Sequence, residues 1–151
     1  MTPVFSHRLD VRFRDCDPMG HVNNAVYLTY LEQARFFHWR ALWGAGGEER
    51  PPALPGERGS PPPPGVDVPG VILARAEIDY RRPAKYGDTL EIRLGIASFG
   101  RTSFTYEYEI VDAVGDLIAA ARTVIVSFDY AAGRPTPIPE AMKKRLTQPL
   151  I

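Results

Sequence analysis

The chain has 151 residues, with 18 basic and 18 acidic side chains and therefore a formal net charge of zero. This length suits one ordinary domain that buries about two-thirds of its unfolded surface without cross-links. The even charge balance does not favour a nucleic-acid or membrane-surface partner. The single cysteine excludes an internal disulfide, and no secretory leader or membrane-spanning apolar run is evident, so we expect a cytoplasmic protein.

The first predicted element is a strand at residues 7–13, where apolar and charged side chains alternate with a period of two. One face consists of His7, Leu9, Val11 and Phe13, and the other of Arg8, Asp10 and Arg12. The stretch that follows, RDCDPMGHVNNAVY at 14–27, places two carboxylates, a thiol, an imidazole and two amides around one Pro-Met-Gly turn. Such crowding calls for a chemical explanation.

A long helix is predicted from Val26 to its end at Gly44, because the apolar period changes to that of an amphipathic helix. Its expected core arc consists of Val26, Tyr27, Tyr30, Leu31, Ala34, Phe37, Ala41 and Leu42. His38 falls within this arc and is interpreted as a core histidine. Leu28, Phe36 and Trp39 lie outside it, which indicates that more than one stripe of the helix is covered.

Residues 44–70 are rich in proline and glycine, which neither continue a helix nor pair inside a sheet. We interpret them as a surface loop, inserted at about 48–66 into a single domain that spans residues 1–151. A ligand for a domain that binds proline-rich peptides is the functional alternative.

Four strands follow, predicted from alternation at 74–81, 90–96 and 104–110 and from a doubly apolar run at 117–129, which is expected inside the sheet. A turn is expected over 131–139, and Pro139-Glu140 opens a short terminal helix. One helix against one mainly antiparallel sheet of five strands is an α+β arrangement, with the sheet wrapped around the helix. The uncovered helix residues and the sheet edges argue for self-association.

The stretch at 14–27 lies where a strand leads into a helix. The first amides of that helix, around Asn23, Asn24 and Ala25, form a site for negative charge and would stabilise an oxyanion. Asp15 and Asp17 flank Cys16, and the turn at Pro18 is expected to separate the two carboxylates, so that one holds the loop and the other faces a pocket. A carboxylate near a helix start suits a nucleophile or a general base.

Each of these residues also has a purely structural interpretation. Asp15 and Asp17 are plausible turn or capping groups, and Asp15 keeps that interpretation. A metal site formed by Asp15, Asp17 and His21 lacks a second histidine at ligand spacing. Cys16 at a strand end is more typical of a small buried side chain than of a nucleophile.

Four collinear blocks, "VRFRDCDPMGHVNNAVYLTYLEQAR", "IDYRRPAKYGDTLEI", "GRTSFTYEYEIVD" and "GRPTPIP", resemble the acyl-CoA thioesterases of the hotdog superfamily, in the branch that includes 4-hydroxybenzoyl-CoA thioesterase. The resemblance implies a hotdog fold, in which a curved antiparallel sheet wraps a central helix and copies assemble as dimers or tetramers. It implies no metal and no bound cofactor, since coenzyme A is part of the substrate.

Transferred residue by residue, the resemblance places the family's catalytic carboxylate at Asp17 and the amide that binds the thioester carbonyl at about Asn24. His21 would bind the carbonyl or position water. The basic residue that contacts the coenzyme phosphates falls on Arg101, close to Ser103. A neighbouring basic residue of some members is replaced by Gly100 or Thr102, which weakens the expected coenzyme contact.

The function expected from the sequence is therefore hydrolysis of an acyl- or aryl-CoA thioester, with Asp17 either attacking the carbonyl or activating water. Glu32 lies on the helix, but the H-G-G segment of the branch with a glutamate nucleophile is absent. Two alternatives stay open at this point. One is a thioesterase that acts on acyl carrier protein, and the other is a non-catalytic hotdog protein that binds acyl-CoA.

Overall fold

The computed structural model describes residues 1–43 and 70–151, and the expected loop insertion at about 48–66 lies outside the described residues. Within the described ranges the chain forms two α-helices, a 3₁₀ turn and six strands. Their order is β1 (Phe5–Asp10), the 3₁₀ turn (Phe13–Asp15), α1 (Val26–Trp43), β2 (Gly70–Tyr80), β3 (Thr89–Phe99), β4 (Ser103–Val111), β5 (Leu117–Asp129), β6 (Arg134–Pro135) and α2 (Glu140–Leu146).

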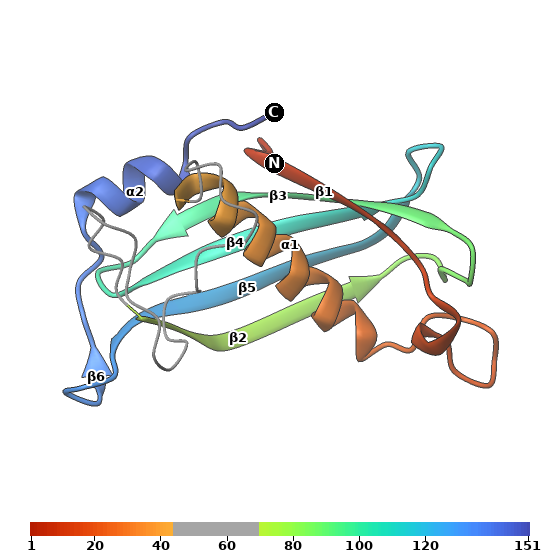
Figure 1. The fold of residues 1–151 in the computed structure, drawn as a ribbon, viewed down its shortest axis with the longest axis horizontal. Coiled ribbons are helices and arrows are strands. Elements are labelled where there is room, and N and C mark those ends of the chain that lie inside the picture. The colour runs from red at the N-terminus through yellow and green to blue at the C-terminus, as the bar shows by residue number, and fades with distance from the viewer. Residues whose placement is uncertain (44–69) are drawn as a thin grey trace.

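The strands form one antiparallel sheet in the order β1-β3-β4-β5-β2, and the short β6 pairs with β5. Helix α1 lies across one face of this sheet, with its first turn beside the β2–β3 connection and its last turn beside α2 (Figure 1). The guanidinium of Arg145 on α2 donates to the carbonyl of Leu42, which fixes this second contact. The predicted α+β fold of one long helix on an antiparallel sheet is confirmed.

The core lies between α1 and the facing side of the sheet. Large side chains that are almost completely buried come from the helix and from the central strands, among them Leu31, Leu90, Ile92, Leu94, Phe104, Tyr106 and Ile110. Strand β5 lies between β4 and β2, as its apolar character on both faces predicted, and it occupies the expected residues 117–129. The loop at residues 14–25 is hydrogen-bonded to the β2–β3 connection at the end of this sheet.

Three expectations about individual elements are wrong. Strand β1 ends at Asp10 rather than residue 13, because Arg12 and Asp15 cap a 3₁₀ turn, and Phe13 is 78% exposed. The buried stripe of α1 contains His38, as expected, and also Trp39, whereas Phe37 and Ala41 of the expected arc are exposed. Part of the turn expected at 131–139 is the two-residue strand β6.

Strand β2 is an edge strand that pairs with β5 alone among the described strands, and most of its residues are exposed, including Ile72 and Leu73.

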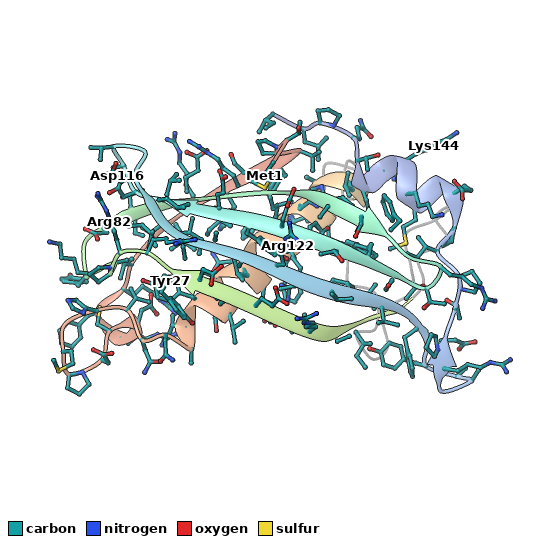
Figure 2. All side chains as sticks on the ribbon, turned by 180° about the vertical axis from the view of Figure 1, so that it is seen from behind. Met1, Tyr27, Arg82, Asp116, Arg122 and Lys144 are labelled. Carbon is teal, nitrogen blue, oxygen red and sulfur yellow. The ribbon has the colours of Figure 1, made fainter. Side chains whose placement is uncertain are left out.

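The two ends of the sheet carry different elements. In the view from behind, Tyr27, Arg82 and Asp116 lie at one end of the sheet, together with the loop that precedes α1, and Lys144 of α2 lies at the other (Figure 2). The candidate site belongs to the first of these ends.

Candidate active site

The loop between β1 and α1 is a small hairpin that brings its polar residues together. Cys16 and Val22 form an antiparallel bridge, the Asp17 amide donates to the His21 carbonyl at 2.9 Å, and the Gly20 amide donates to the Asp17 carbonyl at 3.0 Å. Gly20 has a φ of +85°, a conformation that glycine adopts without strain. Asp17 and His21 therefore face each other across a turn that proline and glycine stabilise.

Asp17 is half-buried, and only one of its two carboxylate oxygens is engaged. Its Oδ1 accepts a hydrogen bond from the Met19 amide at 2.9 Å, which orients the carboxylate within the turn. Its Oδ2 has no hydrogen-bond donor among residues 1–43 and 70–151. One oxygen thus fixes the side chain, and the other remains available for chemistry.

Asp15 has a different environment, although it is only two residues away. Its side chain is 3% exposed, and its carboxylate accepts hydrogen bonds from the Arg12 backbone and guanidinium and from the Tyr30 hydroxyl at 2.7 Å. Burial alone would raise the Asp15 pKa, but the hydrogen bonds from Arg12 and Tyr30 outweigh burial and hold it below its ordinary value. Asp15 is therefore the carboxylate that holds the loop, in agreement with its capping interpretation.

The helix start is organised by Asn23. Its side-chain Oδ1 accepts from the Ala25 amide and its carbonyl accepts from the Val26 amide, both at 2.9 Å, while its own amide donates to the Asp15 carbonyl. The Asn24 amide, in contrast, has no acceptor in the described part of the chain. An exposed residue with a free amide at this position can donate to a ligand oxygen.

His21 is exposed, and its backbone bridges to Lys85, the residue that begins the β2–β3 turn. The loop makes a second contact with the β2–β3 connection, because the Val22 amide donates to the Ala84 carbonyl at 2.8 Å. Asp17, His21 and Asn24 thus lie on one loop that is attached to the β2–β3 connection at two consecutive residues. The structure places these three predicted residues in one region of the molecule.

Three aromatic residues that the sequence analysis did not assign to the site support this loop. Tyr27 and Tyr30 pack edge to face at 5.9 Å, Tyr80 packs against Tyr27 at 5.2 Å, and the Tyr80 hydroxyl donates to the Asn24 carbonyl at 2.7 Å. The Tyr27 hydroxyl accepts from the Ala84 amide. No local sequence signal joins Tyr80 to Asn24, because 56 residues separate them.

Arg101 and Ser103 lie elsewhere. Arg101 lies in the turn between β3 and β4, and Ser103 is the first residue of β4. The Gly100 amide donates to the Ser103 carbonyl at 2.7 Å, and Arg101 is exposed. The loop that precedes α1 adjoins the other end of β3, and this strand has 11 residues, a length of about 35 Å at 3.3 Å per residue. Within one chain, the structure does not bring Arg101 and Ser103 together with Asp17.

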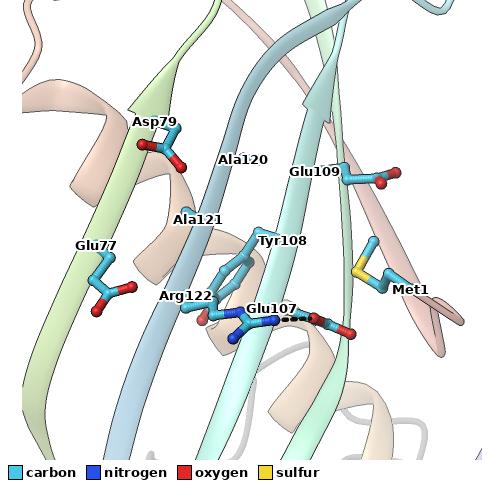
Figure 3. Close-up of a pocket in the computed structure, with 9 residues that line it drawn as sticks. All are labelled: Met1, Glu77, Asp79, Glu107, Tyr108, Glu109, Ala120, Ala121 and Arg122. Carbon is cyan, nitrogen blue, oxygen red and sulfur yellow. Dashed lines mark hydrogen bonds and ion pairs between the residues drawn. The ribbon is translucent and has the colours of Figure 1, made fainter.

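A polar hollow opens on the sheet face opposite α1 (Figure 3). Its carboxylates are Glu77, Asp79, Glu107 and Glu109, and the guanidinium of Arg122 lies 3.5 Å from Glu107. The lining holds no imidazole, thiol or serine hydroxyl, and its one guanidinium is already paired with a carboxylate of the same face. We interpret it as a solvated face of the sheet.

The described residues also contain no group of three or more histidine, cysteine, aspartate or glutamate side chains arranged to hold a metal ion. The carboxylate of Asp15, which the sequence analysis considered as a metal ligand, accepts hydrogen bonds from Arg12 and Tyr30. Cys16 is a free, partly buried thiol that packs against the core. None of the described helices is long and apolar enough to span a membrane.

Comparison with known proteins extends these observations. A family model described as the thioesterase-like superfamily matches residues 11–146. The 1,4-dihydroxy-2-naphthoyl-CoA hydrolase of Synechococcus elongatus is 31% identical over 133 residues, which is 88% of each chain. The acyl-CoA thioester hydrolase YbgC of Escherichia coli is 26% identical, over 97% of this chain and 98% of the relative.

Solved structures give the same result for the fold. A thioesterase from Thermus thermophilus, crystallised with coenzyme A and zinc, is 33% identical, covers 96% of this chain and 98% of its own, and superposes with a TM-score of 0.71. A protein from Bacillus stearothermophilus described as a predicted thioesterase is 26% identical with a TM-score of 0.72, and the match covers 94% of this chain and 92% of that protein.

Proposed function

The chain belongs to the thioesterase-like superfamily, and from this membership together with the loop geometry we propose that it hydrolyses acyl- or aryl-CoA thioesters to the free acid and coenzyme A. Coenzyme A is part of the substrate, so the proposal requires no metal and no resident cofactor. A cytoplasmic location remains a prediction.

One observation carries the proposal. The half-buried Asp17 keeps a carboxylate oxygen without a donor, and the Asn24 amide on the same loop lacks an acceptor among the described residues. Thioester hydrolysis needs these two elements, an oxygen base or nucleophile and a hydrogen-bond donor for the carbonyl oxygen. The neighbouring polar groups of Asp15 and Asn23 are already engaged with protein partners.

In the proposed reaction the thioester carbonyl accepts a hydrogen bond from the Asn24 amide. Asp17 Oδ2 either attacks the carbonyl carbon to give a mixed anhydride, which water then hydrolyses, or removes a proton from a water that attacks. In both routes the carbonyl oxygen gains negative charge, and the coenzyme A thiolate leaves. One preorganised donor at such an oxygen contributes about 3–4 kcal/mol. His21, exposed on the same loop, is assigned to binding the carbonyl or positioning the water.

The separation of Arg101 from Asp17 favours an active site formed by two copies. The β2 edge carries exposed apolar side chains, which is typical of an edge that a second strand covers. Gly70 at the start of β2 pairs with Phe128, and the adjoining part of β5 pairs with Ser103, so the Arg101 turn lies at the beginning of β2. Antiparallel pairing of two β2 strands then moves the Arg101 turn of a second copy toward the end of β2 near Tyr80 and Asn24.

We therefore include a homodimer, or a tetramer built from such dimers, in the proposal. In that assembly Arg101 and Ser103 of a second copy contact the coenzyme portion of a substrate whose thioester lies at Asp17. Leu28 and Phe36 of α1, which are 41% and 42% exposed in one chain, gain cover from the second copy. Light scattering at micromolar concentration is expected to give the mass of a dimer or a tetramer, and a monomer would contradict this part.

The proposal is tested by measuring steady-state hydrolysis over a panel of acyl-CoA thioesters of increasing chain length together with aryl-CoA thioesters. A thiol reagent reports released coenzyme A. We expect at least one substrate to be hydrolysed with a kcat/KM in the ordinary enzymatic range of about 10⁴–10⁸ per molar per second. Free coenzyme A is expected to compete, whereas turnover restricted to thioesters of acyl carrier protein would assign the enzyme to that carrier. No hydrolysis of any substrate would contradict the proposal.

A further inference from the structure

Tyr80 connects the edge strand β2 to the start of helix α1. It is the last residue of β2, its side chain is 48% exposed, and its hydroxyl donates to the Asn24 carbonyl at 2.7 Å. Its ring packs edge to face against Tyr27. Burial raises the Tyr80 pKa, which keeps the hydroxyl protonated and able to donate.

The backbone on both sides of Asn24 is fixed by hydrogen bonds. The peptide unit that contains the Asn24 amide also contains the Asn23 carbonyl, which accepts from the Val26 amide. The next peptide unit contains the Asn24 carbonyl, which accepts from Tyr80, and the Ala25 amide, which donates to the Asn23 side chain. With both planar units held, the two backbone dihedrals of Asn24 are set, and so is the direction of its free amide.

Tyr80 supplies the only one of these restraints that comes from outside the loop and helix. The other two hydrogen bonds are accepted by the side chain and the carbonyl of Asn23, which belongs to the same segment as Asn24. They therefore do not fix that segment relative to the sheet. The hydrogen bond from Tyr80 fixes the direction of the Asn24 amide relative to the sheet. An oxyanion donor contributes most when its position is fixed before the reaction, because no reorganisation is then needed as charge develops.

We propose that Tyr80 is a positioning residue that aligns the Asn24 amide for the developing oxyanion through its hydrogen bond to the Asn24 carbonyl. The inference rests on the proposed function for its catalytic consequence, whereas the restraint on the backbone is a property of the fold. Because Tyr80 ends an edge strand, the alignment depends on the order of β2, the strand that a second copy is proposed to cover.

The test compares Tyr80→Phe with the matched control Tyr130→Phe. Tyr130 is 55% exposed, and its hydroxyl also donates to a backbone carbonyl, that of Val71 at 2.9 Å, near the opposite end of β2. Both variants keep the ring and lose one hydroxyl-to-carbonyl bond. They differ in whether that bond reaches the helix start.

With the best substrate of the wild type, Tyr80→Phe is expected to lower kcat by about 5–30-fold, which is less than the 10²–10³-fold cost of losing an oxyanion donor outright. KM should change less than about twofold, since the bond acts on the transition state. Tyr130→Phe, whose bond lies at the start of β2 and away from the helix start, should leave kcat within about twofold. A kcat for Tyr80→Phe equal to that of the control, or an effect on KM alone, would overturn the proposal.

Hydrogen exchange followed by mass spectrometry tests the restraint without any catalytic readout. In Tyr80→Phe the bonded amides of Ala25 and Val26 should exchange about 3–10-fold faster, the factor expected when a typical net hydrogen bond is lost. In Tyr130→Phe the same segment should be unchanged. If the wild type hydrolyses no thioester, the proposed function fails, while unaltered exchange in Tyr80→Phe refutes the positioning role independently.

Discussion

Replacing Asp15 with asparagine tests the assignment of this carboxylate to the loop rather than to chemistry. The asparagine oxygen can still accept from the Arg12 guanidinium, but the new NH₂ group then faces the Arg12 amide and the Tyr30 hydroxyl, which are both donors to Asp15 Oδ2. The guanidinium side chain is 55% exposed and can be solvated, so the cost arises mainly at the two donors that face the NH₂ group. At about 1 kcal/mol for each, we expect the free energy of unfolding to fall by about 2 kcal/mol.

Urea and thermal unfolding measure this loss, and a domain of this size should lose about 4–8 °C in Tm. Asp112→Asn is the matched control, because Asp112 uses a single oxygen, Oδ1, for the Val114 and Asp116 amides and asparagine retains it. That variant should lose less than about 0.5 kcal/mol. A double-mutant cycle with Tyr30→Phe should give a coupling of about 1 kcal/mol. Equal stability of Asp15→Asn and wild type would refute the reasoning.

Two further predictions concern a buried histidine and the coenzyme contact. Burial lowers the His38 pKa to about 4 from 6.5, so the unfolded chain takes up the proton first and the free energy of unfolding falls as pH drops from about 6.5 to about 4. Across this window the free energy of unfolding should change by about 3 kcal/mol in the wild type, a dependence that His38→Leu should lack. Equal pH dependence in the two proteins would contradict this prediction. Arg101→Ala should raise KM for coenzyme A thioesters more than for pantetheine thioesters, which lack the nucleotide phosphates, and equal changes would remove Arg101 from the coenzyme site.

Much of the fold was predictable, because the spacing of apolar residues that is typical of strands and of helices can be read from short stretches of the sequence. Strand β5 has the predicted bounds, since a long run that is apolar on both faces has few other places in an antiparallel sheet. The helix period identified α1 and both of its ends, and His38 is buried as expected, but the buried arc was rotated, with Trp39 inside and Phe37 outside. Periodicity alone does not determine how a helix that is apolar around most of its surface is turned on the sheet.

The candidate site was predictable where its residues are close in sequence. The turn residues and the predicted helix start indicated that Asp17, His21 and Asn24 lie on one loop. Arg12 and Asp15, three residues apart, form the cap of the 3₁₀ turn that follows β1, and this pairing is local in the sequence. The contacts of Tyr30 with Asp15 and of Tyr80 with Asn24 depend on tertiary packing. The distance between Arg101 and Asp17 follows from the strand topology, which collinear motifs do not report.

The central claim is that Asp17 provides the base or nucleophile for thioester hydrolysis, and single-turnover hydrolysis by Asp17→Asn tests it most directly. Asparagine keeps the side-chain size and an oxygen for the Met19 amide, so circular dichroism and unfolding should match the wild type. The account predicts a rate about 10²–10⁴-fold below wild type with substrate binding retained, while Asp15→Asn, assayed where it is folded, loses far less. A folded Asp17→Asn enzyme that turns over at the wild-type rate would contradict the account.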